Sequence, residues 1–417
     1  MSNTAIINGG NRIMGELVVQ GSKNSVLPIL AATVINGGIN IIHNCPLIKD
    51  VYASIDILRS LGCVVSIEED TVTVDSSNMS CDEIHQDLMK EMRSSVIFTG
   101  AILARCKKAL ISTPGGCELG PRPIDLHLKV FKALGVDVKE THGYIMLDGE
   151  NTHCANINLD FPSVGATENA MLLACATPGT TVITNAAQEP EIVDLQDFLN
   201  GMGANVKGAG TSTIEISGTN DFCDVSHKVI GDRIVTATYL SAAAVTKGSI
   251  KINGINPNHI NAITDMFSLC GAKINKGEDF IEMECKTGLN SVSCISTMPH
   301  PGFPTDAQAL ACTVLSVADG TSVVEENIFS SRFRHIPELN RMNADIITKD
   351  KLAIIRGVSR LKGASVTAYD LRGAAALIIA GLNAYGTTTV SGLEHLDRGY
   401  YLFENQLKNL GADIVRE

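Results

Sequence analysis

The stretch LRSLGCVV, residues 58–65, is the first of six copies of one pattern, apolar-x-x-apolar-Gly-small-x-apolar. The other five copies are FKALGVDV (131–138), LNGMGANV (199–206), FSLCGAKI (267–274), LNRMNADI (339–346) and LKNLGADI (407–414). The glycine position falls at residues 62, 135, 203, 271, 343 and 411. Residue 343 is Asn, a usual substitute where a helix ends in a left-handed residue. The pattern therefore predicts, six times over, a helix that ends at this position and leads into a strand.

Each copy is flanked by further strand-like stretches. Some 23 to 27 residues before the glycine position, a helix ends in a turn and a β-branched stretch follows, as in Gly179–Val182. A third such stretch follows the pattern in the first five copies, but the sixth copy ends at Glu417 without one. We expect the N-terminal stretch Thr4–Ile7 to replace it, which would pair the two ends of the chain in one domain. This predicts one domain of residues 1–21 and 232–417 and a second of residues 22–231.

The composition indicates a turn-rich α/β protein with a core of small aliphatic side chains. Apolar residues make up 45%, aromatic residues only 4%, and there are 37 glycines and no Trp. No apolar run approaches the ~18 residues needed to cross a bilayer, and the N-terminus lacks the pattern of a signal peptide. The 12 cysteines form no CxxC pair and no metal-ligand spacing. The sequence thus predicts a protein of the reducing cytoplasm, with no membrane segment and no metal site.

The charge balance limits the class of ligand. The chain has 33 basic and 45 acidic residues, a formal net charge of −12. Nucleic-acid affinity depends on many Lys and Arg contacts to phosphates, so a nucleic-acid partner is not expected. An anionic ligand would need a local cluster of basic side chains.

Basic and other polar side chains recur at the turns that precede helices, where unpaired backbone N–H groups favour anions. Taken alone, each of these residues is best interpreted as a helix cap or a surface residue. However, the helices after Ser163, Asp306 and Asp370 are almost uncharged, which predicts that they are buried and that their N-termini open onto an interior cleft. A ligand with several phosphates or carboxylates, bound between the two domains, would suit the basic set. Its members are Lys23, Arg93, Arg122, Arg332, Arg372 and Arg398.

Cys117 is the candidate nucleophile or acid. It follows Gly115 and Gly116, and Arg122 lies five residues away, so an exposed thiol here should have a lowered pKa. The alternative is an incidental cysteine, as we expect for the other eleven. His127, in the same segment, reads as structural. The stretch GGCELG has neither a GxGxxG spacing after a strand nor a Walker GK[ST], so no dinucleotide or P-loop site is predicted.

Nine separated motifs give the chain a specific resemblance. In order they are SKNSVLP, MRSS with LAR, PGGCELGPRPIDLH, FPSVGATEN, EPEIVDL, PHPGFPTDAQA, SRFRHIPEL, DLRGAAAL and HLDRGY. Together they resemble the UDP-N-acetylglucosamine 1-carboxyvinyltransferase family over essentially the whole chain. The resemblance implies an α/β fold of two inside-out α/β barrel domains, each of three repeated strand-helix units, with the active site in the interdomain cleft. The six copies of the pattern agree with this fold.

The resemblance also implies an activity. Members transfer the enolpyruvyl group of phosphoenolpyruvate to the 3′-hydroxyl of UDP-N-acetylglucosamine and release phosphate, by addition and elimination. This is the first committed step of peptidoglycan synthesis, and so of cell-wall biogenesis. Both partners are small molecules, no metal or organic cofactor is needed, and we expect a cytoplasmic monomer.

Family roles fall on matching residues of this chain. Cys117 would donate a proton to the methylene carbon, form a covalent adduct with phosphoenolpyruvate and be alkylated by fosfomycin; its loop would close over bound sugar nucleotide. Asp306 would be the base for the attacking hydroxyl. The other residues with an implied catalytic role are Lys23, Arg122, Arg398 and Asp370. The phosphoenolpyruvate set is Lys23, Asn24, Arg122, Arg372 and Arg398. The UDP-sugar set is Asn24, Arg93, Arg122, Pro123, Ile124, Asp125, Leu126, Ser163, Val164, Gly165, Asp306, Ile328 and Arg332.

Two departures and two alternatives remain. Asn343 replaces the usual Gly of the family, and Phe161 stands where some members carry Lys, which puts a side-chain contact to the uridine end in question. One alternative is the shikimate-linked enolpyruvyl transferase, although its Lys-Ser and GNAGT-type signatures are missing. The other is a non-catalytic UDP-sugar-binding relative, against which the intact Cys117, Lys23, Arg122 and Asp306 count.

Overall fold

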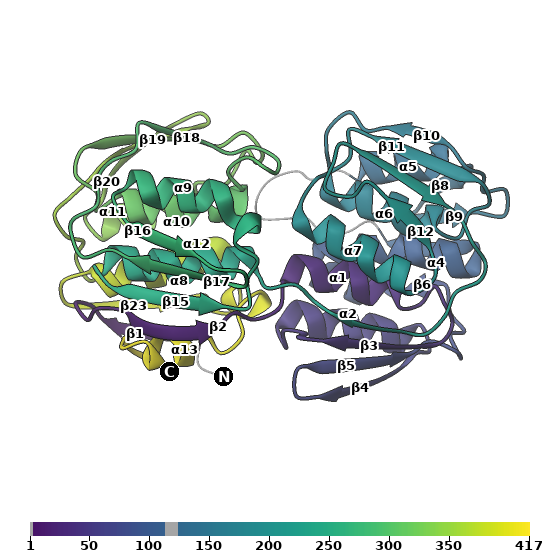
Figure 1. Ribbon diagram of the computed structural model, residues 1–417, viewed down its shortest axis with the longest axis horizontal. Coiled ribbons are helices and arrows are strands. Elements are labelled where there is room, and N and C mark those ends of the chain that lie inside the picture. Colours follow the sequence, from purple (N-terminus) through teal and green to yellow (C-terminus); the bar gives the residue numbers. More distant parts are fainter. Residues whose placement is uncertain (1–2, 113–123) are drawn as a thin grey trace. The chain divides into compact units, whose positions relative to one another are not determined.

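The computed structural model describes residues 3–112 and 124–417, and these residues form two compact units (Figure 1). Unit 1 contains the chain up to Gln20 and from Gly231 to Glu417, and unit 2 contains residues 21–112 and 124–230. Each unit has a hydrophobic core of its own.

Unit 2 consists of three four-stranded sheets and the helices that pack on them. The sheet orders are β14-β3-β5-β4, β6-β7-β9-β8 and β10-β11-β13-β12. The strands are β3 (Ile39–His43), β4 (Val64–Glu68), β5 (Thr71–Asp75), β6 (Glu83–Ile84), β7 (Lys108–Ser112), β8 (Asp137–Thr141), β9 (Tyr144–Asp148), β10 (Asn156–Asn158), β11 (Thr180–Thr184), β12 (Asn205–Lys207), β13 (Thr213–Ser217) and β14 (Val225–Lys228). The helices are α1 (Lys23–Ala32), α2 (Lys49–Ser60), α3 (Gln86–Glu91), the 3₁₀ turn η1 (Arg93–Ile97), α4 (Phe98–Cys106), α5 (Asp125–Ala133), α6 (Val164–Ala174) and α7 (Pro190–Gly201).

Unit 1 repeats this plan. Its sheet orders are β16-β17-β15-β2, β18-β19-β21-β20 and β22-β23-β1-β24. The strands are β1 (Thr4–Asn8), β2 (Met14–Val18), β15 (Ser249–Asn253), β16 (Lys273–Lys276), β17 (Phe280–Glu284), β18 (Cys294–Ser296), β19 (Thr321–Glu325), β20 (Asp345–Lys349), β21 (Leu352–Arg356), β22 (Ser365–Thr367), β23 (Thr387–Ser391) and β24 (Asp413–Arg416). The helices are α8 (Arg233–Val245), η2 (Pro257–Ile260), α9 (Asn261–Leu269), η3 (Thr305–Ala307), α10 (Gln308–Leu315), α11 (Ile336–Arg341), α12 (Leu371–Asn383), η4 (Leu396–Arg398) and α13 (Phe403–Asn409).

All six sheets share one pairing scheme. A short edge strand runs parallel to its neighbour, as β14 does to β3, and the remaining pairs are antiparallel, as in β3 with β5 and β5 with β4. The inner faces alternate with exposed positions, for example in β5, where Val72 and Val74 are fully buried. One sheet face is thus apolar and must be covered by helices.

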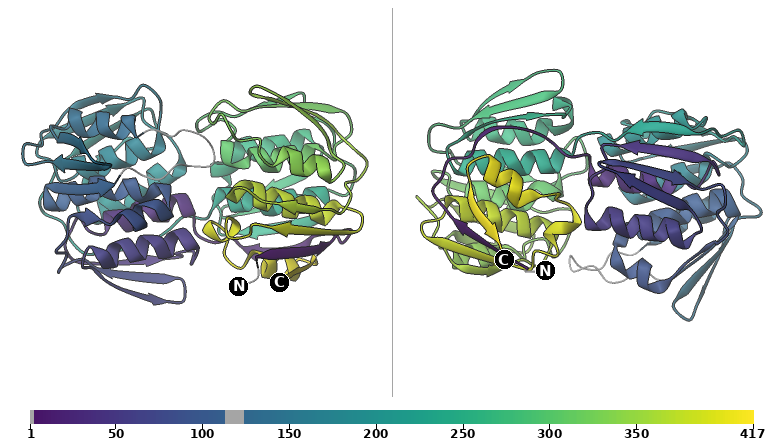
Figure 2. Two further views of the ribbon diagram at one scale, coloured as in Figure 1. Left: turned by 180° about the vertical axis from the view of Figure 1, so that it is seen from behind. Right: turned by 90° about the horizontal axis from the view of Figure 1, so that it is seen from below.

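The most apolar helices lie in the middle of each unit, with the sheets around them (Figures 1 and 2). In unit 1, α8, α10 and α12 pack against one another, and all 13 residues of α8 are buried. In unit 2, α4 packs against both α1 and α6. A helix that is apolar all round belongs in a core, so the predicted burial of the helices after Ser163, Asp306 and Asp370 is confirmed. The inside-out barrel arrangement is likewise confirmed for each unit.

The glycine positions of the six copies have the backbone conformation that the pattern predicts. Their φ angles are positive at all five glycines, from 85° at Gly135 to 105° at Gly203, and 69° at Asn343. A side chain at such φ is strained for most L-residues. Each copy therefore ends a helix and turns the chain into the next strand.

The N-terminal strand completes the last sheet of unit 1. β1 lies between β23 and β24 and pairs antiparallel with both, with Ile6 opposite Thr389 on one side and Val415 on the other. The two ends of the chain therefore lie together in this unit, as Figure 1 shows and as the missing strand of the sixth copy predicts. Within residues 3–112 and 124–417, no helix has the length and apolar character required to cross a bilayer.

Candidate functional site

The charged residues singled out in the sequence lie at the starts of the central helices. In unit 2, Lys23 occupies the first turn of α1, and its Nζ lies 2.7 Å from Oδ2 of Asp50, in the first turn of α2. Both side chains are nearly inaccessible, at 10% and 4% exposed. Because an unpaired buried charge is costly, Asp50 allows Lys23 to remain charged in the interior. Asn24 is half-buried beside it.

The start of α6 forms a second part of this set. Ser163 caps the helix, where its Oγ accepts a hydrogen bond from the backbone N–H of Ala166 at 3.4 Å. A Cβ at Gly165 would lie 2.9 Å from Cε1 of His127, so a side chain at this first-turn position would require the His127 ring to shift. The exposed N–H groups of such a turn attract an anion. Val164 lies in the same turn.

Four other predicted site residues lie at the starts of helices. Ile124 precedes α5, and Asp125 and Leu126 form its first turn. Arg93 begins η1, and nothing is described of its side chain. Three predicted residues lie outside the described residues: Cys117, Arg122 and Pro123.

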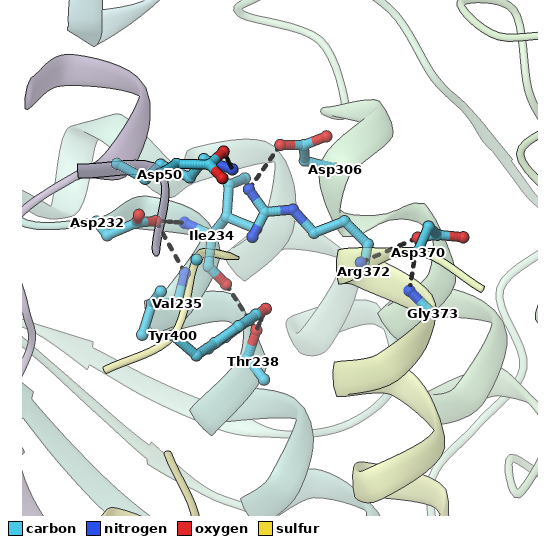
Figure 3. A network of polar contacts seen from close by, with 12 residues as sticks. Asp50, Asp232, Ile234, Val235, Thr238, Asp306, Asp370, Arg372, Gly373 and Tyr400 are labelled. Carbon is cyan, nitrogen blue, oxygen red and sulfur yellow. Dashed lines mark hydrogen bonds and ion pairs between the residues drawn. The ribbon is translucent and has the colours of Figure 1, made fainter. Parts of the chain in front are cut away.

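In unit 1, Asp306 joins two buried arginines, Arg332 and Arg372. Figure 3 shows its contact with Arg372. Its Oδ1 lies 2.8 Å from Nη2 of Arg332, and its Oδ2 lies 2.7 Å from Nη2 of Arg372. The arginine side chains are 4% and 5% exposed, whereas that of Asp306 is 26% exposed. For Arg372, burial alone would lower the pKa, but attraction to Asp306 raises it above the ordinary value. The residues come from η3, the segment after β19 and the first turn of α12, so only the fold brings them together.

Asp370 holds the start of α12. Its Oδ1 accepts hydrogen bonds from the backbone N–H groups of Arg372, at 3.0 Å, and Gly373, at 2.9 Å. Asp232 caps α8 in the same way, with hydrogen bonds from Ile234 and Val235 at 2.8 and 3.0 Å (Figure 3). A carboxylate at the N-cap satisfies N–H groups that the helix leaves unpaired. Asp370 therefore fixes the backbone from which Arg372 projects.

Several buried polar atoms near this network have no hydrogen-bond partner among the described residues. They are Nε of Arg332, Nη1 of Arg372 and both ring nitrogens of His335. Burial is the main reason that the pKa of His335 falls to about 4, so its imidazole is neutral at pH 7. Buried polar groups are nearly always satisfied, by protein, water or ligand. The spare donors of the two guanidinium groups are therefore suited to an anionic ligand.

Arg398 lies in a separate turn of the same unit, η4. Two residues later, the hydroxyl of Tyr400 lies 2.8 Å from Oγ1 of Thr238 on α8. The Arg372 guanidinium lies over the Tyr400 ring, with its Cζ 5.9 Å from the ring centroid. The turn that carries Arg398 is thus joined to both α8 and α12.

Sequence reasoning missed three buried residues that support the predicted ones: Asp50, His335 and Glu326. Glu326 follows β19, and its Oε1 accepts from the N–H groups of Ile328, at 2.8 Å, and Phe329, at 3.0 Å. Its Oε2 accepts from Thr305 Oγ1 at 2.9 Å, next to Asp306. A carboxylate directly after a β-branched strand was the available signal for Glu326. Asp50 had no comparable signal, because its partner Lys23 lies on another helix. The burial of His335 likewise has no marker in its neighbouring residues.

The arrangement supports binding and proton transfer to a carboxylate. Asp306 is partly accessible, and the adjacent guanidinium groups favour its ionised form. In that form it can accept a proton or a hydrogen bond from a ligand hydroxyl. Among the described residues, no group of three or more His, Cys, Asp or Glu side chains is placed to hold a metal ion.

Comparison with known proteins identifies the family. Residues 7–407 match the family described as EPSP synthase (3-phosphoshikimate 1-carboxyvinyltransferase). UDP-N-acetylglucosamine 1-carboxyvinyltransferase 2 of Caldanaerobacter subterraneus is 51% identical over 410 residues, which are 98% of each chain. UDP-N-acetylglucosamine 1-carboxyvinyltransferase 1 of Carboxydothermus hydrogenoformans is 44% identical over 408 residues, which are 98% of this chain and 97% of that one.

Solved structures show the same fold. The enolpyruvyl transferase NikO from Streptomyces tendae superposes with a TM-score of 0.90 at 25% identity, over 100% of this chain and 99% of that one. EPSP synthase from Acinetobacter baumannii superposes with a TM-score of 0.75 at 17% identity, over all of both chains, and supports the fold alone. The resemblance carried by the nine motifs is thereby confirmed, and the chain belongs to the UDP-N-acetylglucosamine 1-carboxyvinyltransferase family.

Proposed function

We propose that this chain transfers the enolpyruvyl group of phosphoenolpyruvate to the 3′-hydroxyl of UDP-N-acetylglucosamine, with release of phosphate, as the first committed step of peptidoglycan synthesis. The observation that carries the proposal is the full-length identity of 51% to a relative of that name. The network of Asp306 with the buried Arg332 and Arg372 supports it, because it combines a partly accessible carboxylate with spare donors for an anion.

The addition and the elimination each require two proton transfers. In the addition, the sugar hydroxyl oxygen bonds to C2 of phosphoenolpyruvate, its proton passes to Asp306, and C3 receives a proton from Cys117. In the elimination, the bond from C2 to the phosphate oxygen breaks and the departing phosphate takes up the proton held by Asp306, while C3 returns a proton to the Cys117 thiolate and the double bond forms again. General acid and base groups typically contribute about 10²–10⁴-fold each to such steps. The role of Cys117 as the proton donor is assigned from the family resemblance.

Basic side chains of the chain would hold phosphoenolpyruvate. Arg372 offers Nη1, Lys23 offers an ammonium group beside Asp50, and Arg398 stands in the turn joined to α12. Arg122 and Asn24 complete the set by resemblance. Negative charge builds up on the phosphate oxygen as its bond to C2 breaks, and fixed cations beside the phosphate stabilise the transition state. In this scheme Asp370 acts by holding the start of α12 and thereby Arg372.

The sugar nucleotide would use a different set. The start of α6 offers backbone N–H groups for its diphosphate, at Val164 and Gly165. Glu326 holds the backbone of Ile328, which would contact the sugar. The remaining members are assigned by resemblance: Arg93, Arg122, Pro123, Ile124, Asp125, Leu126, Ser163 and Arg332. We further propose that the enzyme acts as a cytoplasmic monomer on these two small molecules, without a cofactor.

Phosphate release from purified protein tests the function. Phosphoenolpyruvate is supplied with UDP-N-acetylglucosamine in one arm and with shikimate 3-phosphate in the other. We expect phosphate only in the first arm. Release only in the second arm would assign the shikimate-linked reaction, and release in neither would indicate a binding protein; either result would overturn the proposal.

Fosfomycin labelling tests the assignment of Cys117. We expect one equivalent of fosfomycin on the wild-type chain and none on Cys117→Ser, because only a thiolate opens the epoxide at a useful rate. Mass spectrometry of the intact chain gives the stoichiometry. Cys154→Ser, at an exposed thiol, is the control that should label normally. Labelling of Cys117→Ser at the wild-type rate would move the reactive thiol elsewhere.

A further inference from the structure

The short turn that carries Arg398 is held by two side chains from the opposite ends of the sequence. The first is Arg416, in β24. Its Nη1 lies 2.6 Å from Oδ1 of Asp397, and its Nη2 lies 2.8 Å from Oδ2 of the same carboxylate. Nη1 also lies 3.2 Å from Oε1 of Glu404. A bidentate arginine–carboxylate pair of this kind fixes the relative orientation of the two side chains as well as their distance.

The second side chain is Gln20. Its Nε2 donates a hydrogen bond to the carbonyl oxygen of Gly399 at 3.1 Å, and its Oε1 accepts one from the N–H of Tyr401 at 2.9 Å. The backbone carbonyl of Gln20 accepts from the N–H of Asp232 at 2.9 Å, so its position relative to α8 is fixed as well. Both polar ends of the amide are therefore used on the residues that follow Arg398.

The turn that carries Arg398 is short. η4 has three residues, and its local hydrogen bonds run from Arg398 N–H to His395 at 3.3 Å, from Gly399 N–H to Leu396 at 3.0 Å, and from Asp397 N–H to Leu393 and Tyr400 N–H to Leu396, both at 3.1 Å. A single 3₁₀ turn has weak geometry and fixes many dihedral angles for few bonds. Contacts from outside the turn add to these hydrogen bonds. Gly399 also packs closely on the start of α12, since a Cβ there would lie 2.8 Å from Cδ2 of Leu371.

The pair at Asp397 has an electrostatic consequence for Arg398. Asp397 immediately precedes Arg398, and an uncommitted carboxylate at this position would compete with an anionic ligand for the guanidinium. Arg416 occupies both oxygens of that carboxylate. Asp397 and Arg416 are 27% and 29% exposed, so the pair is partly shielded from water.

We propose that Gln20 and Arg416 are positioning residues that act through Arg398: Gln20 fixes the backbone after it, and Arg416 fixes Asp397, the residue before it. The inference rests on the proposed function, in which Arg398 binds phosphoenolpyruvate. Neither residue contacts the substrates in this scheme.

Steady-state kinetics of single and double variants test the inference. Gln20→Ala, Arg416→Gln and Arg416→Lys are each made in the wild-type and Arg398→Ala backgrounds. In the wild-type background we expect Gln20→Ala and Arg416→Gln to lower kcat/KM for phosphoenolpyruvate about tenfold, the loss expected when a hydrogen bond to a charged group is misplaced. The KM for UDP-N-acetylglucosamine should change less than about twofold. The kcat/KM of Arg416→Lys for phosphoenolpyruvate should lie between those of the wild type and Arg416→Gln, because an ammonium group cannot hold both carboxylate oxygens in the same way.

The Arg398→Ala background separates positioning from general stability. There, each further substitution should change kcat/KM less than about twofold, because residues that act through one group are not additive. Two matched controls should leave wild-type kinetics intact. Asn200→Ala removes an amide that bridges the N–H and carbonyl of Val206, and Arg356→Gln removes an exposed pair with Asp345.

The outcomes distinguish the two proposals. A wild-type chain that releases no phosphate would overturn the proposed function and this inference with it. An active wild type whose variants lose activity equally in both backgrounds, or lose affinity for both substrates alike, would overturn the inference alone. Thermal unfolding is measured on every variant, and if Arg416→Gln does not fold, Gln20→Ala and Arg416→Lys decide the question.

Discussion

At the scale of single residues, the central feature of unit 1 is one carboxylate shared by two buried guanidinium groups. Asp306 neutralises one of the two positive charges of Arg332 and Arg372. The trio keeps a net positive charge and spare N–H donors in a place with little water. Burying a charge without a partner is costly, and a bound anion would relieve that cost. The local chemistry thus favours an anionic substrate in a protein whose net charge is −12.

The first prediction concerns Asp306. Asp306→Asn keeps the shape and an acceptor oxygen but removes the base, so kcat should fall by about 10²–10⁴-fold. Binding of UDP-N-acetylglucosamine, measured by calorimetry, should remain within a few-fold of wild type. Asp345→Asn, at a half-exposed residue paired with Arg356, is the control. Turnover near the wild-type rate would remove Asp306 from the role of base.

The second prediction concerns Glu168, a buried carboxyl group on α6. Burial, with the nearby charges of Glu191 and Glu189, raises its pKa from 4.5 to about 8. The folded chain therefore keeps a proton at pH 7 that the unfolded chain releases, and this contribution to stability is lost as the pH rises from about 4.5 to about 8. Glu168→Gln cannot release a proton.

Urea unfolding at several pH values measures this effect. Between pH 6 and 8 the free energy of unfolding of the wild type should fall relative to that of Glu168→Gln, by up to about 1.4 kcal/mol per pH unit. Above about pH 8 the difference should become constant. Glu215→Gln, at an exposed position of β13, should follow the wild type. Parallel curves for wild type and Glu168→Gln would contradict the shifted pKa.

At the scale of elements, the repeated helix end is the unit from which both barrels are built. The positive φ at each glycine position lets the chain leave a helix and enter a strand within a few residues, as in Gly62 between α2 and β4. Asn343 adopts the same conformation, so its departure from the family pattern preserves the turn. These local conformations follow from residue type, which is why the sequence predicts them.

The third prediction compares two substitutions at this position. Gly271→Ala should destabilise unit 1 by about 1–2 kcal/mol, because φ is 93° and a Cβ would lie 3.1 Å from Nδ2 of Asn290. Asn343→Gly should change stability by less than about 0.5 kcal/mol, because relief of strain is offset by entropy of the unfolded chain. Denaturant unfolding compares both with wild type. A larger loss for Asn343→Gly than for Gly271→Ala would contradict the assigned role.

At the scale of the whole molecule, the last sheet of unit 1 depends on the first strand of the chain. β1 occupies an inner position between β23 and β24, so its loss would leave β24 without a partner strand and β23 paired with β22 alone. Unit 2 has its own core and its own three sheets, none of which includes β1. The consequence of losing β1 should therefore be confined to unit 1.

The fourth prediction follows from this topology. Deletion of residues 1–9 should abolish slow amide exchange throughout residues 231–417 while leaving that of α1, α4 and α6 largely intact. Hydrogen exchange with mass spectrometry measures both regions in one experiment. Deletion of the first two residues, which precede β1, is the control. Retained protection in unit 1 would show that β1 is dispensable for its fold.

The six repeated copies, the buried central helices and the replacement of the last strand by Thr4–Ile7 can all be predicted from the amino-acid sequence. These follow from the spacing of apolar residues and glycines, which acts over a few neighbouring residues. Sequence reasoning also found Asp306, Arg332 and Arg372 as individual candidates, because charged residues beside apolar helices stand out.

Which of these charges meet, and which buried atoms lack a hydrogen-bond partner among the described residues, depends on the folded chain. Asp306 and Arg372 are 66 residues apart, and Gln20 and Gly399 are 379 apart, yet both pairs lie within hydrogen-bond distance. Partner choice depends on which helix starts and turns the sheets bring together and on how far each side chain is removed from water. Neither is encoded in local spacing, so Asp50, His335, Glu326 and the pair that holds Arg398 became visible only in the folded chain.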